Sequence, residues 1–267
     1  MEEEKRIAVI DMDSVVYSII NPNKVLDEFG VPKRTEDNSK FLYTEKTENE
    51  VIESAKFIMN DIFVSSNCTH YIGFIKGRNT ISYRKSINPE YKANRGTEPP
   101  KLWNFCKDYL IKEYNIVEAN NLEVDDFVHM TKLALKDSFI CCIDSDLLGT
   151  EGVHFSWRKK EWITTTKEQA EYKFWVDMIC GTHNNTKGIP GKGIKFAEKC
   201  LEETDGLLMK SIVFENYLHF FGEYEGIQEF YKNYMSLKLL DSYEGFVIPE
   251  PIKVVIKIEE NKVDNLL

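Results

Sequence analysis

Two apolar runs that each end in an aspartate constrain the fold more than any other feature. Residues 7–10 are Ile-Ala-Val-Ile and lead into Asp11, while residues 139–143 are Phe-Ile-Cys-Cys-Ile and lead into Asp144. Continuous apolar runs of this length are typical of strands whose two faces are both buried in a parallel sheet. Apolar residues at helical spacing between these runs, as within 51–62, indicate intervening helices. Alternating strands and helices predict an α/β fold with a parallel sheet.

The character of the chain changes near residue 165. We expect residues 1–160 to form the α/β core and residues 161–267 to form a helical region. Within the second region, residues 170–202 read as a helix, a turn rich in glycine and a second helix. The sequence therefore predicts a helix-hairpin-helix unit that follows the sheet.

Net charge, cysteine spacing and the length of the apolar runs argue against several classes of protein. The net charge of -10 argues against a general nucleic-acid coat, although it says little about local patches. The six cysteines form no Cys-x-x-Cys pair, so we expect buried thiols in a reducing compartment rather than disulfides or zinc. The charged first residues, and apolar runs that stay below about 18 residues, predict a cytoplasmic protein with no membrane partner.

Carboxylates gather where the strands end. Asp11 and Asp144 follow the two apolar runs, and Asp13 and Asp146 come two residues later. Each acid alone is an ordinary turn or helix-start residue. Because the carboxyl ends of parallel strands meet at one edge of a sheet, these acids and those of 123–126 should converge there. Several buried carboxylates repel one another unless cations bind, and all-oxygen ligands favour Mg²⁺ or Mn²⁺. Two such ions can together promote phosphodiester cleavage.

Residues 76–95 carry a net positive charge, whereas the chain as a whole is negative. This segment holds six basic residues against a single acid, Glu90. A solvated helix face would explain Arg78 and Lys85. The interleaved Tyr83 and Tyr91 instead favour a surface that binds the phosphates and bases of a single strand.

The order and spacing of five motifs resemble the 5′-nuclease family. This group of flap endonucleases and 5′-3′ exonucleases includes the nuclease domain of bacterial DNA polymerase I and several phage enzymes. The motifs are VIDMDS at 9–14, PEYKANR at 89–95, LEVDD at 122–126, CIDSDLL at 142–148 and GIPGKGIKFA at 188–197. The resemblance implies a PIN-like parallel-sheet core, a helical arch at about 76–105 and a C-terminal helix-three-turn-helix.

The resemblance also implies an activity and its residues. The activity is divalent-metal hydrolysis of phosphodiester bonds near the 5′ end of DNA that carries a flap, an overhang or a frayed end, RNA-primed ends included. Lys92 and Arg95 would project from the arch toward the scissile phosphate, Tyr91 would stack on a base, and Tyr83 and Arg84 would contact the DNA backbone. Two ions are expected at the first metal site. The residues expected to bind them are Asp11, Glu123, Asp125, Asp126, Asp144 and Asp146.

The glycine-rich hairpin is the second predicted DNA contact. Glycines let the backbone approach phosphates closely, and lysines outnumber acids in this stretch. The resemblance further implies a K⁺ ion held by main-chain carbonyls here. The residues predicted to contact DNA are Lys187, Gly188, Gly191, Lys192, Gly193 and Lys195. The family's members also suggest a monomer from a bacterium or a virus-infected cell.

Two positions depart from the family pattern. The family reads Gly-Asp-x-x-Asp-Asn before the hairpin, where this chain has Gly181 followed by Thr182, with Asn185 at the second acid. The second metal site is therefore expected to be weak or absent unless Asp177, His183 or Asn185 compensates. The second strand of the family also ends in an acid, where this chain has Lys76.

Three functions remain open from the sequence. An active 5′ nuclease agrees best with the retained acids and with Lys92 and Arg95. The loss of acids at Thr182 and Asn185 favours a protein that binds DNA junctions or 5′ ends with little hydrolysis. A ribonuclease of PIN type would need the acids but neither the arch nor the hairpin.

Overall fold

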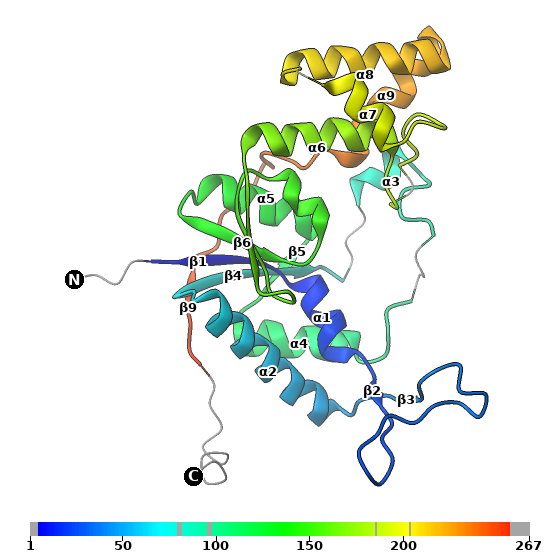
Figure 1. Cartoon of the computed structure of the whole chain (residues 1–267). Helices are drawn as coiled ribbons and strands as arrows, with labels where there is room; N and C mark the ends of the chain where they lie inside the picture. Colours follow the sequence, from blue (N-terminus) through cyan, green and yellow to red (C-terminus); the bar gives the residue numbers. More distant parts are fainter. Residues whose placement is uncertain (1–4, 79–81, 95–97, 185, 203, 257–267) are drawn as a thin grey trace.

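A mostly parallel sheet forms the centre of the molecule (Figure 1). The computed structural model describes residues 5–78, 82–94, 98–184, 186–202 and 204–256. The spatial order of the central sheet is β5-β4-β1-β6-β7-β8, and β9 also pairs with β4. Its strands are β1 (Ile7–Asp11), β4 (His70–Lys76), β5 (Val117–Ala119), β6 (Ser138–Cys142), β7 (Gly152–Ser156), β8 (Glu161–Thr165) and β9 (Ile252–Lys253). Within the described part of the central sheet, only β8 and β9 run antiparallel to their neighbours. The predicted α/β class is confirmed.

The strand order reverses between β1 and β6. From β1 the chain builds outward through β4 to β5, and it then returns to add β6 and β7 on the other side of β1. Ile10 of β1 pairs with Cys141 of β6, so the carboxyl ends of these two strands lie side by side. In open α/β sheets, ligands bind outside the carboxyl ends of the strands at such a reversal.

Helices cover both faces of the sheet. On one face α1, α2 and α4 pack against Ala8 and Ile10 of β1, and on the other α5 packs against Val9 (Figure 1). This alternation of neighbouring side chains explains the continuous apolar runs, because each strand must bury both faces. The helices of this half of the chain are α1 (Met12–Ile20), α2 (Glu48–Ser66), α3 (Tyr83–Ile87), α4 (Trp103–Tyr114), α5 (Val124–Ala134) and the 3₁₀ turn η1 (Ser145–Gly149).

Residues 21–47 are mostly polar and form a segment that extends away from the core. Their regular structure is a two-stranded ribbon of β2 (Asn23–Lys24) and β3 (Tyr43–Thr44). The predicted arch at about 76–105 is described at 76–78, 82–94 and 98–105. Within those residues, the helix that precedes α4 is the short α3, which lies against α9.

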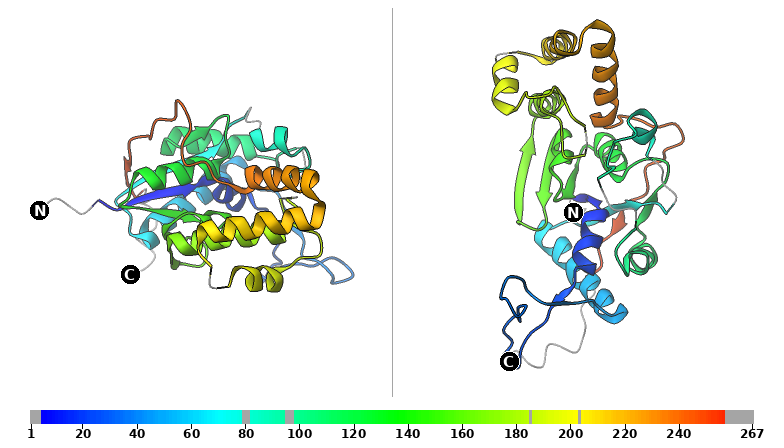
Figure 2. Two further views of the ribbon diagram at one scale, coloured as in Figure 1. Left: turned by 90° about the horizontal axis from the view of Figure 1, so that it is seen from above. Right: turned by 90° about the vertical axis from the view of Figure 1, so that its right-hand side faces the viewer.

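A separate helical core stands above the carboxyl ends of the strands (Figures 1 and 2). Its helices are α6 (Lys167–Cys180), α7 (Ile194–Leu201), α8 (Gly206–Phe221) and α9 (Glu223–Leu237). α6, the turn that follows it and α7 form the predicted helix-hairpin-helix. Gly188 is needed in that turn, because it has a φ of +61° and a Cβ there would lie 2.4 Å from the Gly181 backbone nitrogen.

The chain after α9 returns to the sheet. Residues 239–248 pack over the α5 face through Leu239, Leu240 and Phe246, and β9 then pairs with the start of β4. This return path brings the C-terminal segment next to the start of α5. Within the residues that the structure describes, no helix is long and apolar enough to cross a membrane.

Candidate active site

Asp11 and Asp144 stand together at the reversal of the sheet. Asp11 ends β1 and Asp144 comes two residues after the end of β6, and each uses one carboxylate oxygen to cap the turn that follows. Asp11 Oδ1 accepts a hydrogen bond of 3.0 Å from the Asp13 backbone, and Asp144 Oδ1 accepts one of 2.9 Å from the Asp146 backbone. The two strand ends therefore present their acids in the same way, as the sequence predicts from their parallel pairing.

Asp125 brings a third carboxylate to this edge from the first turn of α5. Burial, and next the charge of Asp11, raise the pKa of Asp125 well above its usual range. Burial raises the pKa of Asp11 to about 7, with further contributions from Asp13 and Asp144. Carboxylates that disfavour one another's charge in this way lie close together in a medium that screens them poorly.

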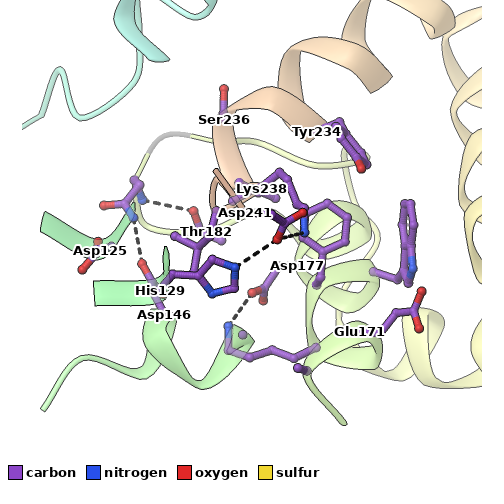
Figure 3. A pocket seen from close by; sticks show the side chains of 18 of the residues that line it. Asp125, His129, Asp146, Glu171, Asp177, Thr182, Tyr234, Ser236, Lys238 and Asp241 are labelled. Atoms are coloured by element: carbon purple, nitrogen blue, oxygen red, sulfur yellow. Dashed lines mark hydrogen bonds and ion pairs between the residues drawn. The ribbon is translucent and has the colours of Figure 1, made fainter. Parts of the chain in front are cut away.

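Asp146 extends the acidic edge toward the helical region. Burial, and then the neighbouring Asp144, raise the pKa of Asp146. Its Oδ2 accepts a hydrogen bond of 3.1 Å from the side-chain amide of Asn184 (Figure 3). Asn184 lies in the turn before the glycine-rich hairpin, so this bond ties the acids of the core to the helical region.

The donor set suits a hard divalent cation. Asp11, Asp125 and Asp144 offer carboxylate oxygens from three elements, and a cation would relieve their mutual repulsion. In the part of the chain that the structure describes, no group of three or more His, Cys, Asp or Glu side chains already stands in a metal-binding arrangement. The fit therefore rests on the chemistry of the donors.

Asp126 is directed away from this group. It is fully buried, and its two oxygens each accept a hydrogen bond of 2.7 Å from the Arg84 guanidinium. Its Oδ1 also accepts a bond of 3.1 Å from the Leu240 backbone. With both oxygens occupied by a cation of the protein itself, Asp126 does not serve the metal set to which the sequence assigned it.

Arg84 is a buried structural residue rather than a DNA contact. Only 2% of it is exposed, and besides Asp126 it donates to Glu123 at 3.2 Å and to the Lys238 carbonyl at 2.9 Å. It therefore joins α3, the start of α5 and the segment after α9. The prediction that Arg84 contacts the DNA backbone does not fit this burial.

Glu123 is also taken up by partners from the protein. Its Oε2 accepts a hydrogen bond of 2.9 Å from the Tyr91 hydroxyl, and its Oε1 one of 2.9 Å from Lys92 Nζ. Although burial acts in the opposite direction, the charges of Lys92 and Arg84 lower the pKa of Glu123. Glu123 thus holds the basic segment against the core, and its predicted role as a metal ligand competes with these bonds.

The two predicted tyrosine contacts are also directed inward. Tyr91 is 4% exposed and hydrogen-bonded to Glu123, so the predicted stacking on a base does not fit its position. Tyr83 is partly buried, and its ring packs on the Arg84 guanidinium at 4.8 Å. The sequence pattern marked an aromatic and basic segment correctly but could not tell its inner face from its outer face.

Lys92 and Arg95 are the two cations predicted to bind phosphate, and the structure describes the first of them. Lys92 remains partly exposed, adopts a positive φ of 53°, and donates its backbone N–H to the Asn184 carbonyl at 2.9 Å. Its ammonium faces Glu123 at the acidic edge. Arg95 lies outside the described residues, as does Asn185.

The hairpin presents its basic side chains outward. Lys187 is exposed and pairs with Glu90 at 2.7 Å, while Lys192 lies over the Phe196 ring at 4.4 Å. Gly188 is buried inside the turn, whereas Gly191, Gly193 and Lys195 are exposed. The exposed members are placed where a duplex could reach them, and their contact with DNA stays a prediction.

Sequence analysis missed Asn184 and Lys173, and it named Asp13 only as one of the converging acids. Asn184 contacts Asp146, whereas the neighbouring Asn185 was considered. Asp13 accepts the Lys76 backbone N–H at 2.9 Å, at the strand end where the family pattern expects an acid. Lys173, which pairs with Asp177 at 2.6 Å, gave no signal beyond a spacing of one helical turn.

A cavity of about 330 Å³ opens beside the acidic edge. Asp125 and Asp146 line it from the core, and Asp177 and Thr182 line it from the helical region (Figure 3). Lys173 of α6 also lines it. His129 also reaches this cavity, where its Nε2 lies 3.1 Å from Asp241 of the C-terminal segment.

Solved structures that are similar to this chain in shape include nucleases. The flap endonuclease of bacteriophage T5, in a complex with DNA and metal ions, matches 87% of this chain and 89% of its own at a TM-score of 0.61 and 13% identity. A variant of the T5 5′-exonuclease matches 89% of this chain and 88% of its own at a TM-score of 0.57 and 14% identity. The chain has the PIN-like fold of these 5′ nucleases. The fold that the motif order predicted is thereby confirmed.

Comparisons of the sequence found no relative, and one further solved structure is similar in fold. A scan against protein-family models found no match, and neither did a comparison with curated proteins. A further T5 5′-exonuclease structure, with divalent zinc ions bound, matches 88% of this chain and all of its own at a TM-score of 0.50 and 13% identity. At these identities the likeness concerns the fold alone.

The role of Arg84 can be tested by its removal. Arg84→Met leaves Asp126 and Glu123 buried without their guanidinium, so we expect the free energy of unfolding to fall by about 3–5 kcal/mol. Urea denaturation measures it. Lys85→Met, the exposed neighbour on α3, is the control and should change stability by less than about 0.5 kcal/mol. Equal and small effects of the two changes would contradict the structural role.

Proposed function

We propose that this chain is a structure-specific 5′ nuclease that hydrolyses phosphodiester bonds near the 5′ end of DNA with a bound divalent metal ion. The observation that carries the proposal is the meeting of buried Asp11 with partly buried Asp125 and Asp144 at the reversal of the sheet. Such carboxylates destabilise a fold that does not use them, because each raises the cost of charging its neighbours. The shared fold with phage 5′ nucleases supports the same function.

Asp11, Asp125 and Asp144 would hold the ion, and Mg²⁺ is the hard cation that best suits an all-oxygen set. When bound, the ion supplies Lewis-acid activation of water and stabilises charge on the phosphate. The protein's part is to keep the three carboxylates close and partly desolvated. Asp13 supports this arrangement by tying the start of α1 to the end of β4.

Lys92 supplies the positive charge for the reacting phosphate in this proposal. Its ammonium faces Glu123 at the same edge, and its backbone bond to Asn184 fixes the segment that carries it. When a phosphate arrives, the ammonium can exchange the Glu123 carboxylate for a phosphate oxygen that gains charge in the transition state. We propose the same role for Arg95 because it lies with Lys92 in the motif PEYKANR at 89–95.

The substrate is proposed to be DNA with a 5′ flap, overhang or frayed end, RNA-primed ends included. Exposed Lys195 and partly exposed Lys192 of the hairpin supply contacts to duplex phosphates, which carry no sequence information. A K⁺ ion held by hairpin carbonyls, action as a monomer and a cytoplasmic location belong to the same proposal. The six cysteines are all free thiols, as a reducing compartment would require.

Cleavage of an end-labelled 5′-flap DNA tests the proposed function. We expect product near the junction in Mg²⁺ or Mn²⁺ and none with chelator. Asp144→Asn should reduce the rate by more than about 100-fold, because changes just outside metal ligands already cost up to that much. Asp137→Asn, an exposed residue just before β6, is the control and should keep full activity. Tight flap binding without metal-dependent product would instead support the DNA-binding alternative.

Lys92→Met tests the role of the lysine. Because its interaction with phosphate should strengthen in the transition state, we expect kcat to fall by about 100-fold while KM changes little. Initial rates of multiple-turnover cleavage over a range of substrate concentrations separate the two parameters. Lys40→Met, at an exposed site in the segment 21–47, controls for the loss of one positive charge. An unchanged kcat would show that Lys92 serves only to bind Glu123.

A further inference from the structure

The turn between α6 and the glycine-rich hairpin faces Asp146 without any carboxylate. The sequence from Thr182 to Lys187 holds no acid. Asn184 instead donates its side-chain amide to Asp146 Oδ2 at 3.1 Å, and Thr182 lines the same cavity (Figure 3). Neutral oxygens bring no charge to offset the desolvation of a divalent ion, so this side of the site binds such an ion poorly.

A lysine of α6 occupies this side of the cavity. Lys173 Nζ lies 2.6 Å from Asp177 Oδ2, and both side chains are 28% exposed. Lys173 and Asp177 line the cavity together with Asp146. The protein therefore places its own cation next to the acids of the region where the family pattern expects a second metal site.

We propose that Lys173, held by Asp177, carries the positive charge that a second divalent ion would bring, so that the chain binds one divalent ion. This inference rests on the proposed function and revises the two ions expected from sequence. The single ion lies at Asp11, Asp125 and Asp144. An ammonium and a divalent ion repel each other strongly in a partly buried cavity, so the lysine excludes the second ion as well as replacing its charge.

Lys173 acts here as a positioning residue. Its charge balances Asp146 and Asp177, and the Asn184 amide fixes the orientation of the Asp146 carboxylate. Asp146 can then hold its place beside Asp144 with no ion of its own. The lysine needs no contact with the reacting phosphate for this role.

Counting bound Mn²⁺ on the purified full chain tests the proposal without reference to activity. Electron paramagnetic resonance measures the unbound ion during a titration, and this gives the stoichiometry. We expect one ion for the wild type and one for Lys173→Arg, which keeps the charge. Lys173→Met removes the ammonium and leaves Asp146 and Asp177 unbalanced, so it should bind two ions. Lys173→Met combined with Asp177→Asn should return to one.

The outcomes separate this proposal from the proposed function. Two ions in the wild type, or one ion in Lys173→Met, would overturn the role of Lys173 and leave the nuclease proposal standing. No bound Mn²⁺ in the wild type would overturn both. Because Lys173 is partly exposed, its variants should keep the fold, and a thermal unfolding midpoint close to that of the wild type confirms that each count refers to the folded chain.

Discussion

Carboxylates that lie together away from water need positive charge nearby, and this requirement organises the whole site. Three groups of acids obtain this positive charge from three different sources. Arg84 balances Asp126 and Glu123 from within the fold. We propose that Lys173 balances Asp146 and Asp177, and that a divalent ion balances Asp11, Asp125 and Asp144. The protein thus neutralises its structural acids permanently and leaves one group for an exchangeable cation.

The Arg84 cluster also explains how distant segments are held near the acidic edge. Arg84 binds the start of α5 through Asp126 and the C-terminal segment through the Lys238 carbonyl. Tyr91 and Lys92 then bind Glu123, so the basic segment is fixed to the same helix start. Because Asp125 lies between Glu123 and Asp126 in sequence, fixing these neighbours fixes its position as well. The positions of the basic segment and of the acidic edge therefore depend on one buried network.

The sequence predicted the parts of this site that follow from local pattern. Strands that must bury both faces show continuous apolar runs, and parallel pairing then brings Asp11 and Asp144 together. Successive residues of a helix point about 100° apart, so the sequence could not tell that Asp125 faces the edge while Asp126 faces Arg84. That distinction depends on a partner 42 residues away. The contact of Asn184 with Asp146 likewise depends on the path of a single turn.

Anomalous diffraction from crystals grown with Mn²⁺ would test the central claim most directly. The account predicts one strong peak, bounded by carboxylate oxygens of Asp11, Asp125 and Asp144, with Asp126 still bound to Arg84. A peak at Asp126 or Glu123, or no peak at the acidic edge in crystals saturated with Mn²⁺, would contradict it.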